Sequence, residues 1–125
     1  MTRIFLAIAS ILGGLSVAAG AFASHALKEK LTERGLEIFQ TGARYQMYHS
    51  LALMLVALLL SRAEVAQTSL TVAGSAFIAG IAIFSGSLYA LSLTGIKWLG
   101  AIAPLGGAAL ILGWGCLAIA AFSFQ

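Results

Sequence analysis

Residues 42–60 read GARYQMYHSLALMLVALLL, a stretch in which polar and ionisable side chains lead directly into an unbroken apolar run. The run that starts at Leu51 is typical of a helix that crosses a bilayer, for which about 20 mostly apolar residues are needed. The residues before it bring in a cation, two phenols, a carboxamide and an imidazole, where a purely structural span would have Leu and Ala. Because polar groups inside a membrane are costly and often functional, this entry into the span is the main clue to function.

The composition extends this interpretation to the whole chain. Of the 125 residues, 61% are hydrophobic and only 9% are charged, against about 25% charged in a typical soluble protein. This apolar length suffices for four spans and leaves too little polar sequence for a second domain. We therefore predict an all-α membrane protein, a four-transmembrane-helix bundle that forms a single transmembrane domain over residues 1–125. The predicted spans are residues 4–27, 43–61, 69–93 and 98–122.

Residues 28–41 form a strongly charged segment between the first two spans. On a helical wheel Glu29, Glu33 and Glu37 recur on one side, while apolar residues gather on another. This pattern predicts a short amphipathic helix that lies in the membrane interface. An ordinary solvated connecting helix is the alternative. The second span then begins near Gly42 or Arg44, with Thr41 as its N-cap.

Small residues recur at helical spacing in several spans. Lipid provides no hydrophobic drive between helices, so such stripes predict close helix contacts. In the last span, Pro104 removes a backbone hydrogen bond and, with Gly106 and Gly107, predicts a kink or a close approach of a second helix. The two clearest stripes are Ser16, Gly20 and Ser24 in the first span, and Ala82, Gly86 and Ala90 in the third.

The two histidines, His25 and His49, are predicted to lie near the same membrane face, at the end of the first span and the start of the second. Such a pair could ligate haem or a metal ion, or relay a proton. The alternative is that each is a neutral histidine hydrogen-bonded across a helix interface. No Asp is present and Cys116 is the single cysteine, so further metal ligands are scarce.

Other polar side chains in the second and third spans are predicted to gather with the histidines in one cluster. The cluster is interpreted either as a ligand pocket or pathway closed by a cation, or as interhelical hydrogen bonds that fix the helix register. Its predicted members are His25, Arg44, Tyr45, Gln46, His49, Ser85, Ser87 and Tyr89.

Motifs spread along the chain resemble those of a known family. They are Gly20-Ala21-Phe22 with His25, Gln40-Thr41-Gly42 with Tyr45-Gln46 and His49, Phe84-Ser85-Gly86-Ser87-Leu88-Tyr89, Pro104-x-Gly106-Gly107 and Gly113-Trp114. In this order they resemble the bacterial membrane family catalogued as domain of unknown function 423, which has small mitochondrial transmembrane relatives. The chain departs from the family pattern at Ala23-Ser24, where Gly-Ala is usual, and at Ala103, where Thr is usual. The resemblance implies a four-span protein of the bacterial inner (plasma) membrane without an assigned activity.

We expect a non-enzymatic membrane component without catalytic residues, cofactor or metal. Its expected role is lipid binding or an accessory role in a membrane assembly, with membrane lipid and either a larger complex or further copies of the chain as partners. Two alternatives stay open: a small transporter or ion-conducting protein with a polar pathway near Arg44 and His49, and a haem or redox protein with histidine ligands. Nucleic acid is not an expected partner, because the basic residues from Lys28 to Arg44 are interleaved with Glu.

Overall fold

The structure, a computed structural model, describes residues 1–124 and is built from four long helices. The first, α1 (Thr2–Phe22), continues into a π-helical turn, η1 (Ala23–Leu27). The others are α2 (Glu33–Arg62), α3 (Gln67–Thr94) and α4 (Leu99–Ala121). Each of the four, with η1 counted as part of the first, is long and apolar enough to cross a membrane. The predicted all-α bundle of four membrane-spanning helices is therefore confirmed.

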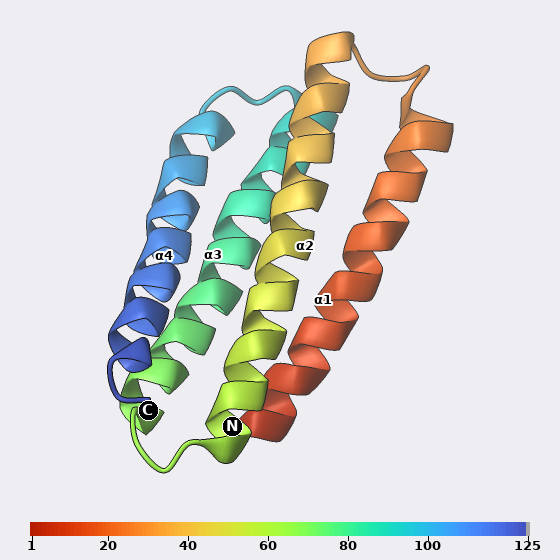
Figure 1. Cartoon of the computed structure of the whole chain (residues 1–125). Coiled ribbons are helices and arrows are strands. Elements are labelled where there is room, and N and C mark those ends of the chain that lie inside the picture. The colour runs from red at the N-terminus through yellow and green to blue at the C-terminus, as the bar shows by residue number, and fades with distance from the viewer. Residues whose placement is uncertain (125) are drawn as a thin grey trace.

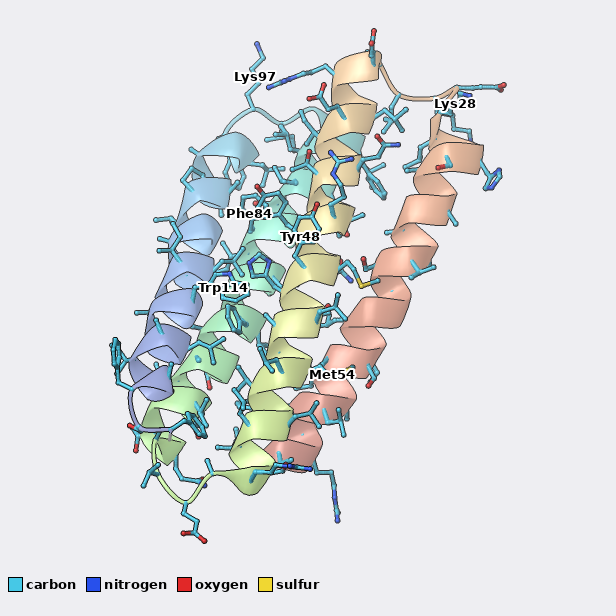
Figure 2. All side chains as sticks on the ribbon, viewed as in Figure 1. Lys28, Tyr48, Met54, Phe84, Lys97 and Trp114 are labelled. Atoms are coloured by element: carbon cyan, nitrogen blue, oxygen red, sulfur yellow. The ribbon has the colours of Figure 1, made fainter. Side chains whose placement is uncertain are left out.

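The helices lie side by side in the order of the sequence, and each runs antiparallel to the one before it (Figure 1). α1 and α4 form the two outer edges, with α2 and α3 between them. Both termini lie at one end of the molecule, which we call the terminal end. Figure 2 shows Lys28 and Lys97 at the opposite end, in the loops that follow η1 and α3. We call this opposite end the loop end.

α2 begins earlier than predicted. The Thr32 hydroxyl caps it by accepting a hydrogen bond from the Gly35 backbone N–H at 3.0 Å. From there α2 runs for 30 residues without a break, a length of about 45 Å, and extends beyond the other helices at the loop end (Figure 1). Thr41 lies inside α2, where its hydroxyl donates to the Glu37 carbonyl. The predicted separate interfacial helix and the predicted cap at Thr41 are therefore wrong.

The apolar side of the first turns of α2 packs on protein instead of lying on a lipid surface. Phe39 is buried in a small cluster with Ala23 and Leu27 of η1, and Leu36 and Tyr89 pack against this cluster. The ring centroids of Phe39 and Tyr89 are 4.8 Å apart. These contacts stabilise the charged residues that begin α2 as a continuous helical extension of the span that follows.

One main core joins all four helices. Phe5, Leu53, Val56, Leu70 and Phe77 are among its fully buried side chains. Phe5 is a point at which α1 reaches α3, because its ring occupies the space where a side chain at position 74, a glycine, would lie. α1 otherwise packs on α2, so much of its surface faces outward.

Glycines set the closest contacts between α3 and α4. A Cβ atom at Gly106 would lie 2.3 Å from the backbone nitrogen of Phe84, so the two helices approach too closely there for any side chain. A Cβ atom at Gly107 would make an ordinary contact of 3.8 Å with the Phe84 ring. α4 runs through Pro104 as one uninterrupted helix. Of the two glycines, Gly106 is therefore the one whose missing side chain permits the close contact between α3 and α4.

Two other glycines do not contribute to packing. At Gly20 and Gly86 no heavy atom lies within 4 Å of the place where a Cβ would be. Their predicted role in helix contacts is wrong, because no neighbouring helix comes into contact at these two positions. Sequence spacing alone does not reveal which face of a span is covered.

Candidate functional site

The Gln46 carboxamide links three helices. Its Nε2 donates a hydrogen bond of 2.8 Å to the Leu12 carbonyl on α1, and its Oε1 accepts one of 2.6 Å from the Tyr89 hydroxyl on α3. Gln46 is only 5% exposed. Because a carboxamide offers both a donor and an acceptor, this one side chain fixes the register of α2 against both neighbours.

Serine hydroxyls reinforce this register from both sides of α2. Ser16 of α1 donates to the Ala43 carbonyl at 2.8 Å, and Ser85 of α3 donates to the Gly42 carbonyl at 2.7 Å. The carbonyls of two successive α2 residues thus accept hydrogen bonds from the two neighbouring helices, Gly42 from α3 and Ala43 from α1. Ser87, in contrast, donates to the Phe84 carbonyl within α3 and makes no bond across helices.

His49 is buried, and both of its ring nitrogens are engaged. Its Nδ1 lies 2.7 Å from the Tyr45 carbonyl oxygen, and its Nε2 lies 3.1 Å from Nε1 of Trp114 on α4. An indole N–H can only donate, so Nε2 is the acceptor and Nδ1 carries the proton. The arrangement therefore holds a neutral imidazole with no free nitrogen.

Aromatic rings surround this imidazole. The ring centroids of Tyr45, Phe77 and Trp114 lie 6.0, 5.7 and 5.9 Å from that of His49. Figure 2 shows Trp114 near the middle of the bundle, well away from Lys28 and Lys97. The His49–Trp114 hydrogen bond therefore lies among aromatic rings and away from both ends of the bundle, where water would compete for it.

The structure does not bring His25 and His49 together. His25 is exposed in η1, at the loop end, whereas His49 lies about 24 Å along α2 from Glu33. The prediction that the two histidines lie near one membrane face is wrong, because it counted the second span from Gly42. This separation is incompatible with joint ligation of a haem iron or a single metal ion.

Arg44, Tyr45 and Tyr48 are the exposed members of the polar stretch. The two phenol rings lie 5.6 Å apart, and Tyr45 also lies 4.9 Å from Phe84. The Arg44 guanidinium donates to the Thr41 hydroxyl at 3.3 Å. Unlike the buried members, Arg44 therefore has donors directed away from the protein interior.

Arg44 borders a groove of about 320 Å³ between α1 and α2. No acidic residue lines the groove. Along α2 the lining runs from Gln40, nearest the loop end, past Arg44 to Met47, and along η1 and α1 it runs from Ser24, nearest the loop end, to Ser16. Among the lining residues are Val17, Gly20 and Ser24 on one side, and Gln40, Arg44 and Met47 on the other.

Within residues 1–124, every buried side-chain nitrogen or oxygen atom has a hydrogen-bond partner. The same residues contain no group of three or more His, Cys, Asp or Glu side chains that could hold a metal ion. The interior polar cluster thus consists of groups that satisfy one another, while the groove is open and mostly apolar and is lined by one cation, Arg44.

The sequence interpretation missed the groove and the partner of His49. Trp114 lies in the middle of an apolar span, although Trp in membrane proteins is enriched at the interfaces. Its indole N–H needs an acceptor there. His49, the only buried imidazole in the described chain, supplies this acceptor. The unusual depth of Trp114 in its span was the available signal in the sequence.

We predict that Trp114→Phe lowers the free energy of unfolding by about 1–3 kcal/mol, because His49 Nε2 loses its donor in an apolar interior. Thermal unfolding in a mild detergent, followed by circular dichroism, measures the change. Trp98→Phe is the control, since Trp98 and Trp114 are 63% and 46% exposed, whereas the hydrogen bond to His49 is made by Trp114. Equal, small shifts for both variants would show that the indole hydrogen bond does not stabilise the bundle.

Comparison with known proteins agrees with the motifs. The family model described as "Protein of unknown function (DUF423)" matches residues 19–107. The chain belongs to the DUF423 family. The matched range starts near the end of α1 and reaches into α4, so it includes Gln46, His49 and the α3 side of the polar cluster. The resemblance predicted from the motifs is confirmed.

Relatives of this DUF423 protein are similar over nearly their whole length. The UPF0382 membrane protein YwdK of Bacillus subtilis (strain 168) is 43% identical over 122 residues, which cover 98% of both chains. UPF0382 membrane protein SAB0533 of Staphylococcus aureus (strain bovine RF122 / ET3-1) is 38% identical, again over 98% of both. No solved structure matches the chain. The relatives' names describe membrane proteins and state no activity.

Proposed function

We propose that this DUF423 protein is a non-enzymatic component of the bacterial inner membrane that binds lipid in the groove between α1 and α2. The inner membrane is proposed because the spans are helices, whereas the spanning proteins typical of outer membranes are β-barrels. The observation that carries the proposal is the contrast between an interior whose buried polar groups are all hydrogen-bonded within residues 1–124 and an open groove lined by the exposed cation Arg44.

The paired interior argues against chemistry or transport through the centre of the bundle. A catalytic base, a metal ligand or a step in a proton pathway needs a free lone pair or a hydrated group. His49 has neither, since Tyr45 and Trp114 engage both of its nitrogens. Gln46 and Tyr89 are bonded to each other. Their arrangement supports the register-fixing interpretation over a transport pathway or a haem site.

The groove has the features of a lipid site. It opens on α1, an edge helix whose exposed side chains are mostly apolar, so lipid is the natural neighbour. Gly20 leaves open space instead of contacting another helix. Ser24 and Gln40 lie at the loop-end part of the groove, and Met47 is the lining residue of α2 that lies farthest from the loop end. This order matches a molecule with a polar headgroup and an apolar chain.

We predict that Gly20→Leu fills the groove and removes tightly bound lipid without unfolding the protein. Gly14→Leu is the matched control: it lies on the same helix, also has nothing within 4 Å of its Cβ position, and is outside the groove. The protein is extracted in mild detergent, exchanged extensively, and its retained lipid is measured by native mass spectrometry. Wild type and Gly14→Leu should retain about one lipid per chain, and Gly20→Leu should retain none.

Two outcomes would overturn the proposal. Wild-type protein without retained lipid would remove its basis, and so would an ion or solute flux in proteoliposomes that depends on the buried His49. If a co-purified polypeptide, instead of a lipid, is lost on Gly20→Leu, the groove is a protein docking site and the role is that of an accessory subunit.

A further inference from the structure

We propose that the groove recognises the phosphate of an anionic phospholipid through Arg44, while an acyl chain follows the groove past Val17 and Met47. This inference rests on the proposed function, because it specifies the class of lipid that the groove would take. The charge, the depth in the membrane and the direction of the Arg44 side chain support it independently.

The depth of Arg44 suits a headgroup contact. Leu60 lies near the terminal end of α2, and Arg44 precedes it by about 24 Å of helix. In a bilayer core of about 30 Å, Arg44 then lies close to the boundary of the loop-end leaflet. Arginine side chains at such depths reach toward the interface while their methylene stems stay in the apolar region.

The direction of the side chain agrees with this depth. Side chains on a helix tilt toward its N-terminus, which for α2 is the loop end. The hydrogen bond from the Arg44 guanidinium to Thr41, one turn earlier on α2, has this direction. The guanidinium therefore points from the groove toward the headgroup layer.

No acidic residue lies one turn from Arg44 on α2; the first acidic residue on its side of the helix is Glu37, two turns toward the loop end. The neighbours of Arg44 one turn away are Gln40, Thr41, Met47 and Tyr48, and no acidic residue lines the groove. Its one hydrogen bond in the structure is the long one to Thr41. A guanidinium has five N–H donors in a planar fork that fits two phosphate oxygens. A phosphodiester is the membrane group that matches this charge and geometry.

The charged segment around the start of α2 supplies no comparable attraction, and the remaining loop-end cation, Lys97, precedes α4 at the edge of the bundle away from the groove (Figure 2). Residues 28–37 contain three basic residues, Lys28, Lys30 and Arg34, and three acidic ones, Glu29, Glu33 and Glu37. Mixed charges of equal number produce little net field beyond a Debye length of about 10 Å. A preference for anionic lipid would therefore come from the groove itself and not from a general basic surface.

The test compares lipid binding in nanodiscs by native mass spectrometry, with phosphatidylglycerol and phosphatidylcholine at equal mole fractions. Both lipids carry a phosphodiester, but the choline ammonium offsets its charge in phosphatidylcholine. Wild-type protein should therefore retain phosphatidylglycerol about ten-fold better, a difference of about 1.4 kcal/mol. Arg44→Gln should abolish the preference, and Arg44→Lys should keep part of it, because an ammonium keeps the charge without the fork. Arg62→Gln, which removes a cation at the terminal end, should leave the preference unchanged.

Each outcome separates the two proposals. Equal retention of both lipids, lost on Gly20→Leu, would overturn the role of Arg44 and keep the groove as a lipid site. Absence of any retained lipid would overturn both. Displacement of phosphatidylglycerol by millimolar inorganic phosphate would assign the site to free phosphate and overturn the lipid. Unchanged circular dichroism and melting temperature of Arg44→Gln, expected for an exposed residue, exclude unfolding as the cause of lost binding.

Discussion

Gly106→Ala is expected to destabilise the bundle by about 3 kcal/mol, at the upper end of the usual cost of overpacking. The added Cβ would lie 2.3 Å from the backbone nitrogen and 2.7 Å from the Cα of Phe84. Backbone atoms cannot rotate away as the tip of a side chain can, so α3 and α4 must separate. Because dispersion contacts instead of a hydrophobic drive hold helices together in lipid, this separation loses the main stabilising term.

The neighbouring glycine provides a matched control. Gly107→Ala adds the same methyl group one position later, where its contact with the Phe84 ring would be an ordinary one of 3.8 Å. Ala is favoured over Gly in a helix interior by about 1 kcal/mol, so this variant should be neutral or more stable. Both are measured by thermal unfolding in mild detergent. If the two variants melt together, the close contact of α3 with α4 at Gly106 does not exist.

Phe77 and Gly113 should show strong coupling in a double-mutant cycle. Phe77 is fully buried, and a Cβ at Gly113 would lie 2.5 Å from its ring. Phe77→Ala should therefore cost about 2 kcal/mol of packing, less than in a soluble core because lipid is as apolar as the interior. Gly113→Ala should cost about 1–3 kcal/mol through overlap with the ring.

The double variant should be less destabilised than the sum of the two single ones, by about 1–2 kcal/mol, since the new methyl group fills part of the space that the ring leaves. Gly115→Ala, on the same helix with nothing within 4 Å, is the control and should add no coupling with Phe77→Ala. Strictly additive effects of Phe77→Ala and Gly113→Ala would mean that the ring does not pack on α4 at this glycine.

The membrane spans were predictable because apolar length is a local property of the sequence. The polar entry at Arg44 to His49 was also recognised, but its depth was wrong, since the start of α2 depends on tertiary contacts. Phe39 packs on η1 and beside Tyr89, and this packing turns the predicted interfacial helix into an extension of the span. Because α2 starts about ten residues earlier than predicted, His49 lies about 24 Å along α2 from Glu33 and far from His25.

The glycines show the other limit of sequence reasoning. Small-residue spacing identifies a smooth helix face but not the helix that covers it. Gly86 belongs to a regular stripe and has open space beside it, whereas Gly80 and Gly113, for which no helix contact was predicted, accommodate Leu110 and Phe77. The groove at Gly20 follows from the same fact, because a smooth face on an edge helix is left for lipid.

The polar stretch from Gly42 to Ser50 thus divides into two parts with different roles. Gln46, His49 and Ser50 face inward, and their hydrogen bonds reach Leu12, Tyr89 and Trp114 on the other helices, or the backbone of α2 itself. These bonds fix the helices in register. Arg44 faces outward beside the groove, and it is the group left to interact with something outside the chain.

Photo-crosslinking with a phosphatidylglycerol that carries a diazirine in its acyl chain tests this division most directly. After illumination of the protein in nanodiscs, the crosslinked positions are mapped by mass spectrometry of peptides. We predict crosslinks concentrated at Val17 and Met47 that disappear in Gly20→Leu. Crosslinks spread evenly over exposed positions such as Ile111, which is 73% exposed, and unaffected by Gly20→Leu, would contradict a lipid site in the α1–α2 groove.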